Sequence, residues 1–574
     1  YKPREFDPRS GSFSISYMDY ATPVQEPIMK RFITRHRLQK KNPALPLSEA
    51  VEPIVYYLDN GTPEPVRSAL LDGARWWNQA FEALGYKDAF QVKMLPDDAD
   101  PMDVRYNVIQ WVHRSTRGWS YGASIIDPRT GEILKGHVSL GSLRIRQDFL
   151  IAQALMNKPF ADSDDNYLPM LEMALARIRQ LSAHEIGHTL GLAHNFAASV
   201  SDRASVMDYP HPKFTLKDSI ISFENAYATG MGDWDKISIA YAYASFSEGK
   251  NEKDELNKIL SEAQEANIRF ITDSDSRAPG GAHPFAHLWD NGDDAASELL
   301  NVLKVRETAI KNFSEHNIRS NEPYSVLEDV FVPLYFFHRY QTEAVAKVIG
   351  GVDYNYAVKG DGQATAKIVD AQAQRAALSA FLKTLDAETL AIPQEKLGLF
   401  PPRAMGYERT RESFKSLSGV TFDPLSAVET AADYSLGALL HPERAFRLIQ
   451  QKAIDEKQLS LQEVIDSITQ KTIKTKLEKG YLGEVQQAVN FSVLKNLMAL
   501  GAHEKAPAQV QALINFEMMK LKTLLSAKHI DPYSILMVKE IDKYLGNPKG
   551  YKALAAPKIP DGAPIGMDCL MNNE

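Results

Sequence analysis

The sequence predicts an α+β fold in two parts, a mixed sheet with helices followed by a mostly helical region. Between about residues 53 and 248, short apolar runs of strand character alternate with segments of helical period. After about residue 250 the strand patterns nearly vanish. The length of 574 residues also exceeds what one hydrophobic core usually serves, so at least two domains are expected.

Changes in composition along the chain divide it into three regions. The first 50 residues are rich in Pro, Arg and Lys, and residues 1–44 are expected to be an arm or linker that follows a missing domain upstream. Residues 45–248 carry the mixed strand and helix patterns, and residues 249–574 form a mostly helical domain. The basic run 30–41 (KRFITRHRLQKK) more readily forms a solvated strand or arm on the surface than a binding patch.

Bulk properties exclude several classes of protein. The net charge of -8 is mild for this length and gives no electrostatic footprint for nucleic acid. No run of about 18 uninterrupted apolar residues is present, so no transmembrane segment is expected. The single cysteine, Cys569, rules out an intrachain disulfide. None of these features fixes an oligomeric state.

The first elements of the mixed region follow from hydrophobic patterning. Residues 54–58 (IVYYL) are typical of a buried strand. Pro63 and Pro65 then open a helix whose apolar positions recur every three to four residues until Gly85 stops it. Further strands are predicted at 90–94, where apolar residues alternate, and at 104–112.

A tight hairpin and a long helix complete the mixed region. Strands are expected at 122–127 and 132–140, because the Pro-Arg-Thr-Gly sequence between them has strong turn chemistry. A helix is predicted over 168–190. Beyond it, helical patterns separated by Gly and Pro breakers predict helices at 253–270, 295–313, 325–349, 368–386, 436–455, 461–476, 484–500, 507–526 and 532–545.

The chemistry is concentrated in residues 184–194, HEIGHTLGLAH, at the end of the long helix. His184 and His188 are four residues apart, which corresponds to about 400° of rotation and a rise of about 6 Å, so both imidazoles face one side. Two imidazoles placed in this way suit a tetrahedral zinc ion. His194 is six residues further on and in a continuing helix would point roughly 240° away from His188. The helix must therefore break, and Gly191 is placed for this because glycine takes positive φ at little steric cost.

Three neutral histidine ligands leave a zinc ion its full charge and one open coordination position. A water molecule there has its pKa lowered to about 7. Glu185 follows the first ligand directly and can take the proton of that water and pass it to a leaving amine. The expected cofactor is one catalytic Zn²⁺.

The HExxHxxGxxH pattern resembles the zinc signature of the metzincin metallopeptidases. That clan also has a methionine turn downstream, and Ser205-Val206-Met207-Asp208-Tyr209 resembles it. The resemblance implies that Met207 forms an apolar floor beneath the histidines without binding zinc. Tyr209 matches the tyrosine of astacins and serralysins, which can contact zinc and swing to stabilise the oxyanion; the alternative is that Tyr209 only forms part of the pocket wall. Asn195 departs from the pattern, because it is neither the glutamate of astacins nor the proline of serralysins that follows the third histidine.

The order of elements before the signature is also similar to that of the clan. By this likeness residues 119–126 form the substrate-facing edge strand, with Gly122, Ala123 and Ser124 at its centre, and a peptide would bind there as an added strand. A helix opening at Asp233 would close the catalytic domain.

Stretches outside the signature resemble a family of large bacterial zinc metallopeptidases. These stretches are YKPREFDPRSGSF, ARWWNQAFEALGY and AHPFAHLWDNG. Members of this family carry an uncharacterised N-terminal domain before the metzincin core and a helical C-terminal domain after it. The resemblance implies an exported bacterial protein, either periplasmic, surface-associated or secreted.

Two acidic groups are weaker candidates for metal sites. Carboxylates near His283 and His287 could bind Ca²⁺, which takes several oxygen ligands, but their spacing matches no known calcium loop and favours capped turns. The same holds for Asp162, Asp164 and Asp165, which fit a solvated loop better than a lid. The carboxylates of the first group are Asp273, Asp275, Asp290, Asp293 and Asp294.

The sequence therefore predicts a zinc-dependent endopeptidase that acts on proteins or peptides. Two alternatives remain open, a binding or adhesion protein that retains a zinc peptidase fold and a zinc hydrolase of a non-peptide substrate. An intact Glu185 argues against the first alternative, because zinc binding alone does not need that carboxylate.

Overall fold

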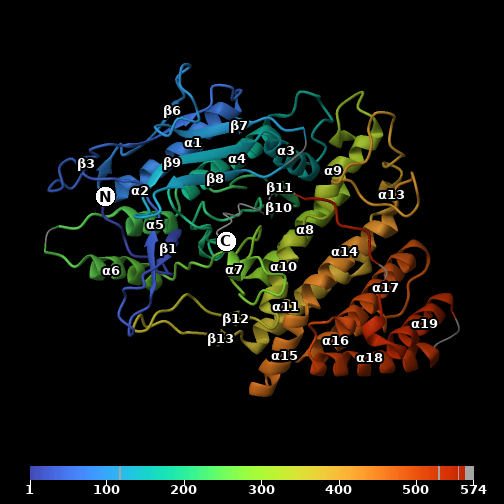
Figure 1. Cartoon of the computed structure of the whole chain (residues 1–574). Coiled ribbons are helices and arrows are strands. Elements are labelled where there is room, and N and C mark those ends of the chain that lie inside the picture. The colour runs from blue at the N-terminus through green and yellow to red at the C-terminus, as the bar shows by residue number, and fades with distance from the viewer. Residues whose placement is uncertain (116–117, 248, 528–530, 554, 563–574) are drawn as a thin grey trace.

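The computed structural model of the chain describes residues 1–115, 118–247, 249–527, 531–553 and 555–562. Cys569 lies outside these ranges. Figure 1 shows the strands of residues 14–141 gathered on the left of the molecule and the later helices packed together beside them. The predicted α+β class is confirmed.

A five-stranded sheet forms the centre of the first part, with the strand order β6-β4-β7-β9-β8. Four strands run parallel, and β8 pairs with β9 antiparallel at one edge of the sheet. The strands predicted from alternation and apolar runs are confirmed, as is the tight β8–β9 hairpin. Their bounds are β4 Ile54–Leu58, β6 Phe90–Met94, β7 Asn107–Val112, β8 Tyr121–Ile126 and β9 Ile133–Gly141.

Helices α1 (Val66–Arg75) and α4 (Leu168–Thr189) pack on each other, and α4 also contacts β8 and β9. Gly73 allows the two helices to approach closely, because a Cβ atom there would be 1.9 Å from the carbonyl oxygen of Arg179. Where the sequence predicts one helix up to Gly85, the chain forms two, since α2 (Trp77–Ala83) starts after a break at Trp76. The α4 prediction is confirmed within one residue.

Helix α3 (Arg144–Leu155) has no counterpart among the predicted elements. Its buried positions include Arg144 and Asp148, which form a buried ion pair at 2.8 Å, and two glutamines. Charged and amide side chains on the inner face remove the apolar period that would indicate a helix.

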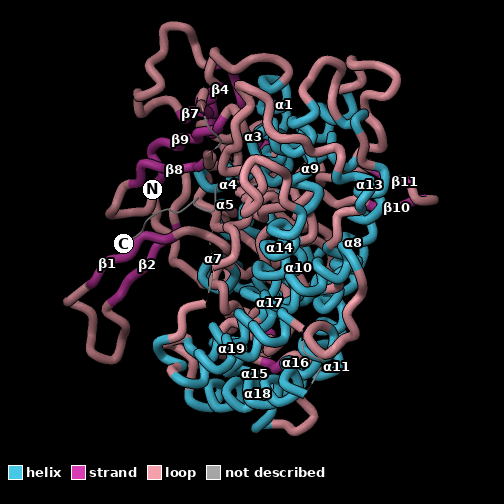
Figure 2. Tube along the Cα trace, turned by 90° about the vertical axis from the view of Figure 1, so that its right-hand side faces the viewer, coloured by secondary structure: helices cyan, strands magenta, loops and turns pink. Residues whose placement is uncertain are grey.

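The N-terminal residues are built into the first part of the fold. Strands β1 (Ser14–Met18) and β2 (Met29–Ile33) form an antiparallel hairpin that projects from the body of the molecule (Figure 2). The base of the hairpin docks on the end of α4, because the Phe13 amide donates to the Gly191 carbonyl at 2.7 Å. Residues 33–36 are buried, so the interpretation of 30–41 as a solvated strand or arm is wrong for this stretch.

Short elements complete the first part and the segment that follows it. Three small two-stranded sheets pair β3 with β5, β10 with β11 and β12 with β13. Their bounds, with those of the following helices, are β3 Ser48–Glu49, β5 Tyr86–Lys87, β10 Thr215–Lys217, β11 Ile220–Ser222, β12 Val352–Asp353, β13 Lys367–Ile368, α5 Asp233–Tyr243, α6 Glu252–Glu265 and α7 Asp273–Ser276.

The second part is mostly helical, as predicted. Two expected helices are divided in the structure, and the expected 253–270 helix ends earlier, at Glu265. The 325–349 segment forms α9 and α10, separated at residues 336–338, and the 436–455 segment spans the end of α14 and all of α15, which starts at Pro442. The helices are α8 Ala295–Asn312, α9 Leu327–Tyr335, α10 Arg339–Val348, α11 Ala371–Leu382, α12 Ala387–Leu390, α13 Gln394–Leu397, α14 Pro424–Leu439, α15 Pro442–Ile454, α16 Leu461–Lys471, α17 Gly480–Ala502, α18 Ala508–Ala527 and α19 Pro532–Gly546.

One hydrophobic core joins the helical part to the first part. The cluster that contains the cores of α8–α11 and α14–α19 continues through α3 and reaches Met170 and Met173 at the start of α4. Burial of this shared apolar surface holds the two parts together. Within the described ranges, no helix combines the length and apolar character needed to cross a membrane.

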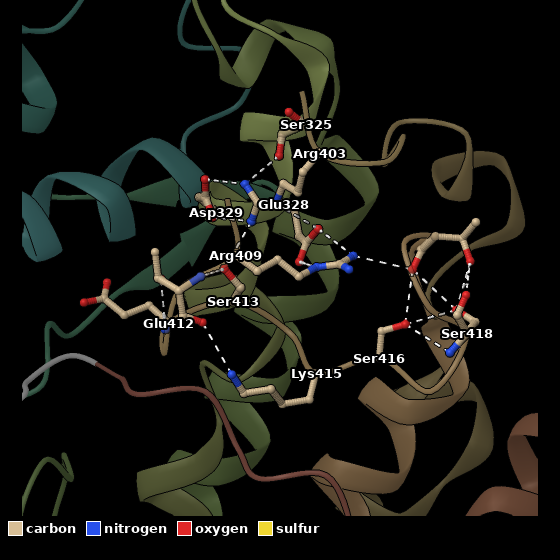
Figure 3. A network of polar contacts seen from close by, with 12 residues as sticks. Ser325, Glu328, Asp329, Arg403, Arg409, Glu412, Ser413, Lys415, Ser416 and Ser418 are labelled. Atoms are coloured by element: carbon tan, nitrogen blue, oxygen red, sulfur yellow. Dashed lines mark hydrogen bonds and ion pairs between the residues drawn. The ribbon is translucent and has the colours of Figure 1, made fainter. Parts of the chain in front are cut away.

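The long connection between α13 and α14 is held against α9 by an ion network (Figure 3). Arg403 pairs with Asp329 at 2.6 Å, and Arg409 pairs with Glu328 at 3.3 Å. Glu328 is buried, so its two arginine partners offset the cost of removing its charge from water.

Candidate metal centre

Three imidazoles converge at the end of α4. The Nε2 atom of His188 lies 3.2 Å from that of His184 and 3.1 Å from that of His194. All three side chains are buried. The structure therefore brings together the three residues that the sequence pattern predicts as ligands.

The arrangement of nitrogen atoms fits a zinc ion. Nitrogen ligands about 2.0–2.1 Å from a tetrahedral ion are roughly 3.3 Å apart, close to the separations found here. In addition, the Nδ1 atom of each ring already faces an acceptor, the carbonyl oxygens of Val206 and Leu192 at 2.7 and 2.9 Å and the Asp273 carboxylate at 2.8 Å. With the ring proton on each Nδ1, the Nε2 lone pairs point at one another, which is unfavourable unless a cation lies between them.

Burial keeps these imidazoles neutral. It lowers the pKa of His188 to about 3, with a further contribution from His194, and lowers the pKa of His184 well below its usual value. The pKa of His194 is also lowered by burial, against the opposing effect of Asp273. Neutral imidazole is the form that binds a metal.

The chain leaves the α4 helix at Gly191, which has a φ of +94°. A Cβ atom at this position would be 2.0 Å from the carbonyl oxygen of Thr34. Glycine is therefore needed both for the backbone conformation and for the close approach of the N-terminal segment. The turn brings the Leu192 carbonyl to His188 and carries His194 back to the other two ligands.

The methionine turn packs against the end of α4, at Gly187 and His184. Met207 is fully buried, and a Cβ atom at Gly187 would be 2.1 Å from the Met207 sulfur, so this floor contacts the middle of the metal-binding turn of α4. Asp235 in α5 fixes the turn, accepting from the Ser205 hydroxyl at 2.6 Å and from the Val206 amide at 2.9 Å.

Tyr209 lies beside the ligands. Its ring centroid is 4.8 Å from that of His194 and 5.2 Å from that of His184. The Tyr209 hydroxyl accepts a hydrogen bond from Arg277 at 3.2 Å, and its ring stacks on Trp289 at 4.6 Å. The side chain thus has a fixed position next to the metal-binding nitrogens.

The edge strand β8 packs on the turn of α4 that carries Glu185. Glu185 is buried, and in the sequence of α4 it lies between His184 and His188. Gly122 of β8 packs on the same turn, because a Cβ atom there would be 2.2 Å from the Glu185 carbonyl oxygen and 3.1 Å from the Cβ of His188. Ala123 and Ser124 follow along β8 and are half-buried.

The acidic residues that the sequence suggested for calcium do not converge. Asp273 pairs with His194, Asp275 accepts from the hydroxyls of Tyr354 and Tyr356, and Asp294 caps α8. Among the His, Cys, Asp and Glu residues of the described ranges, the group placed to hold a metal is the triad of His184, His188 and His194. The calcium prediction gains no support from this geometry.

Asp273, Arg277 and Trp289 are site residues that the sequence did not reveal as such. Asp273 stood among the acidic residues of the calcium prediction, and its spacing of 79 residues from His194 gives no local signal. An acidic residue four positions before an arginine in DSDSR is a common surface pairing. Their contacts with the site exist only in the folded chain.

An α4 helix with two ligands, a glycine break before the third and a buried methionine turn define a metzincin. The chain belongs to the Met-zincin family, whose model matches residues 167–480, more than half of the sequence. It is accordingly a zinc metallopeptidase in the general sense of that family. Residues 1–41 match a second family, described as a domain of unknown function. Comparison with curated proteins and with solved structures gave no match.

Proposed function

We propose that this chain is a zinc-dependent endopeptidase that hydrolyses peptide bonds with Glu185 as general base and then general acid. The observation that carries the proposal is the convergence of three neutral imidazole nitrogens at the end of α4, whose last turns also carry the buried Glu185. Zinc held by His184, His188 and His194 would polarise the scissile carbonyl and lower the pKa of a water molecule.

Glu185 and Tyr209 would carry out the proton transfers and stabilise the oxyanion. Glu185 takes a proton from the attacking water and delivers it to the departing amine, a role typically worth ~10²–10⁴ in rate. Tyr209, held 4.8 Å from the His194 ring, donates a hydrogen bond to the carbonyl oxygen as negative charge develops there.

The edge strand supports an extended peptide substrate. β8 is the last strand of the sheet, and Gly122 lies directly against the metal-binding turn. A peptide that adds to the outer edge of β8 through Ala123 and Ser124 would run past the metal site in both directions. Such a substrate is cut at an internal bond, which is why we propose an endopeptidase.

The test compares Glu185→Gln with wild type on a proteome-derived peptide library read by mass spectrometry. We expect the variant to keep one equivalent of zinc and to lose peptidase activity by ~10²–10⁴. Glu172→Gln is the matched control, because Glu172 is an exposed glutamate of the same helix. Full activity in the zinc-loaded Glu185→Gln variant would refute the mechanism.

The same samples separate the other functions. Zinc binding without cleavage of any peptide would identify a binding protein with a retained peptidase fold. If the protein cleaves an ester or amide library but leaves all peptides uncut, it is a hydrolase of a non-peptide substrate.

A further inference from the structure

The backbone of the segment 269–289, which follows α4 and α5 in the sequence, is hydrogen-bonded to the two residues directly after His194. Asn195, the residue directly after the third ligand, donates from Nδ2 to the Arg269 carbonyl at 2.8 Å and accepts from the Ile271 amide at 3.3 Å. The Phe196 amide donates to the Ile271 carbonyl at 2.8 Å. Asn195 therefore holds residues 269–271 beside His194. These contacts give a role to the residue at which the sequence departs from the astacin and serralysin patterns.

A series of polar contacts connects His194 to Tyr209. The Nδ1 atom of His194 lies 2.8 Å from the Asp273 carboxylate, and Asp273 also accepts a short hydrogen bond from Arg277 Nε. The far end of the guanidinium donates to the Tyr209 hydroxyl at 3.2 Å, and its centre lies 5.2 Å from the ring centroid of the same tyrosine. One carboxylate therefore connects a metal ligand to the guanidinium that holds the tyrosine.

Aromatic rings and a backbone hydrogen bond hold this series of contacts in place. The Arg277 side chain is 18% exposed and lies over the rings of Phe196 and Tyr209. The Trp289 amide donates to the Tyr209 carbonyl at 2.9 Å, and the two rings stack. A charged pair that is largely shielded from water in this way is stronger and better oriented than a surface pair.

We propose that Asp273 and Arg277 are positioning residues of the metal centre, the first for His194 and the second for Tyr209. The inference rests on the proposed function for the part that concerns Tyr209. It assigns part of the active-site machinery to a segment that lies after α4 and α5 in the sequence.

Each residue acts by a separate physical effect. A carboxylate that accepts the Nδ1 proton of a histidine fixes the ring orientation and strengthens its Nε2 atom as a ligand. A cationic donor to a phenol oxygen holds the hydroxyl group in place and makes its O–H a stronger donor to a developing oxyanion. Tyr209 in this arrangement is a fixed donor and does not swing during the reaction.

The Asp273 arm is tested by metal binding and does not need peptidase activity. We expect Asp273→Asn to weaken zinc binding ~10–100-fold in chelator competition. We also expect it to change the visible absorption spectrum of the cobalt-substituted protein. Asp275→Asn is the matched control, because Asp275 lies in the same short helix and bonds to Tyr354 and Tyr356. Wild-type affinity and spectrum in Asp273→Asn would overturn this assignment.

The Arg277 arm is tested by a double-mutant cycle with Tyr209→Phe. We expect Arg277→Met to lower kcat roughly 10-fold at little change in KM or zinc affinity, and Tyr209→Phe to lower it roughly 10²-fold. The double variant should be no slower than Tyr209→Phe alone, and Arg277→Lys should recover part of the loss. Multiplying effects in the double variant would overturn the proposal, because Arg277 would then act independently of Tyr209.

The two arms also distinguish failure of this inference from failure of the proposed function. A protein that binds zinc but cuts no peptide refutes the proposed function, and with it the Tyr209 part, while the zinc affinity and cobalt spectrum still decide the role of Asp273.

Discussion

The carbonyl oxygen of Val206 accepts a hydrogen bond from Nδ1 of His184 at 2.7 Å, so the methionine turn orients the first metal ligand. The amide of Val206 is held in turn by Asp235 of α5. Helix α5 thus fixes the ring of His184 through a single residue, Val206, whose N–H and C=O belong to successive peptide units. This relationship leads to the first prediction.

Asp235→Asn is expected to destabilise the protein by about 2–4 kcal/mol. Asp235 is fully buried and accepts from Ser205, Val206 and the amide of Gly232 at 2.8 Å, and an asparagine has one oxygen to offer these donors. Denaturant unfolding of the zinc-free protein measures the loss. The control Asp233→Asn changes an exposed side chain of the same helix and should stay within about 0.5 kcal/mol of wild type. Equal stability of the two variants would contradict the role given to Asp235.

Gly191→Ala is expected to lower both stability and zinc affinity. An alanine at positive φ costs roughly 1–2 kcal/mol by itself, and here its Cβ would also overlap the Thr34 carbonyl oxygen. Gly360 is a matched control because it has the same φ of +94° and no atom within 4 Å of an added Cβ. Gly360→Ala should show the backbone cost alone. If both variants lose the same free energy of unfolding, the close contact with Thr34 has no energetic role.

Stability of the zinc-free protein is expected to fall as the pH is lowered below about 6.5. Burial lowers the pKa of His36 to about 4 in the folded chain, whereas an unfolded chain protonates histidine near 6.5. The folded-state pKa is depressed, so the stability present above pH 6.5 is lost as the pH falls towards 4. For His36 this loss is about 3 kcal/mol by pH 4.

His36→Gln tests this assignment. Glutamine can still donate to the Thr189 carbonyl that His36 Nε2 contacts at 3.1 Å, but it does not titrate. Urea unfolding at pH 7.5 and pH 5 should show a loss smaller by about 2 kcal/mol in this variant than in wild type. His503→Gln, at an exposed histidine, is the matched control. An identical pH dependence in all three proteins would show that folding does not change the protonation of His36, against this assignment.

Removal of the metal is expected to lower the melting temperature reversibly. The site exists only in the folded chain, so zinc at a thousandfold excess over its Kd stabilises the fold by about 4 kcal/mol. Differential scanning calorimetry with and without a chelator measures this shift, and added zinc should restore it. In His188→Ala, which lacks the central ligand, chelator should produce no shift; a shift of wild-type size there would place the stabilising zinc elsewhere.

Much of the fold follows from local patterns in the sequence. The strand at 54–58 and the helix at 168–190 are recognisable because apolar residues repeat with the period of one secondary structure. Helix α3 and the ends of α14 and α15 are not, since buried polar side chains or a proline interrupt that period.

The candidate site likewise has residues that local sequence patterns predict and residues that they do not. His184, Glu185 and His188 are placed by the geometry of a single helix, and the position of His194 by one glycine, so residue spacing alone predicted the histidine triad. Asp273 and Arg277 joined the site only in the tertiary structure, because their contacts cross 79 and 68 residues of chain. Local backbone geometry determines contacts over a few residues, whereas contacts over such distances depend on how the whole core packs.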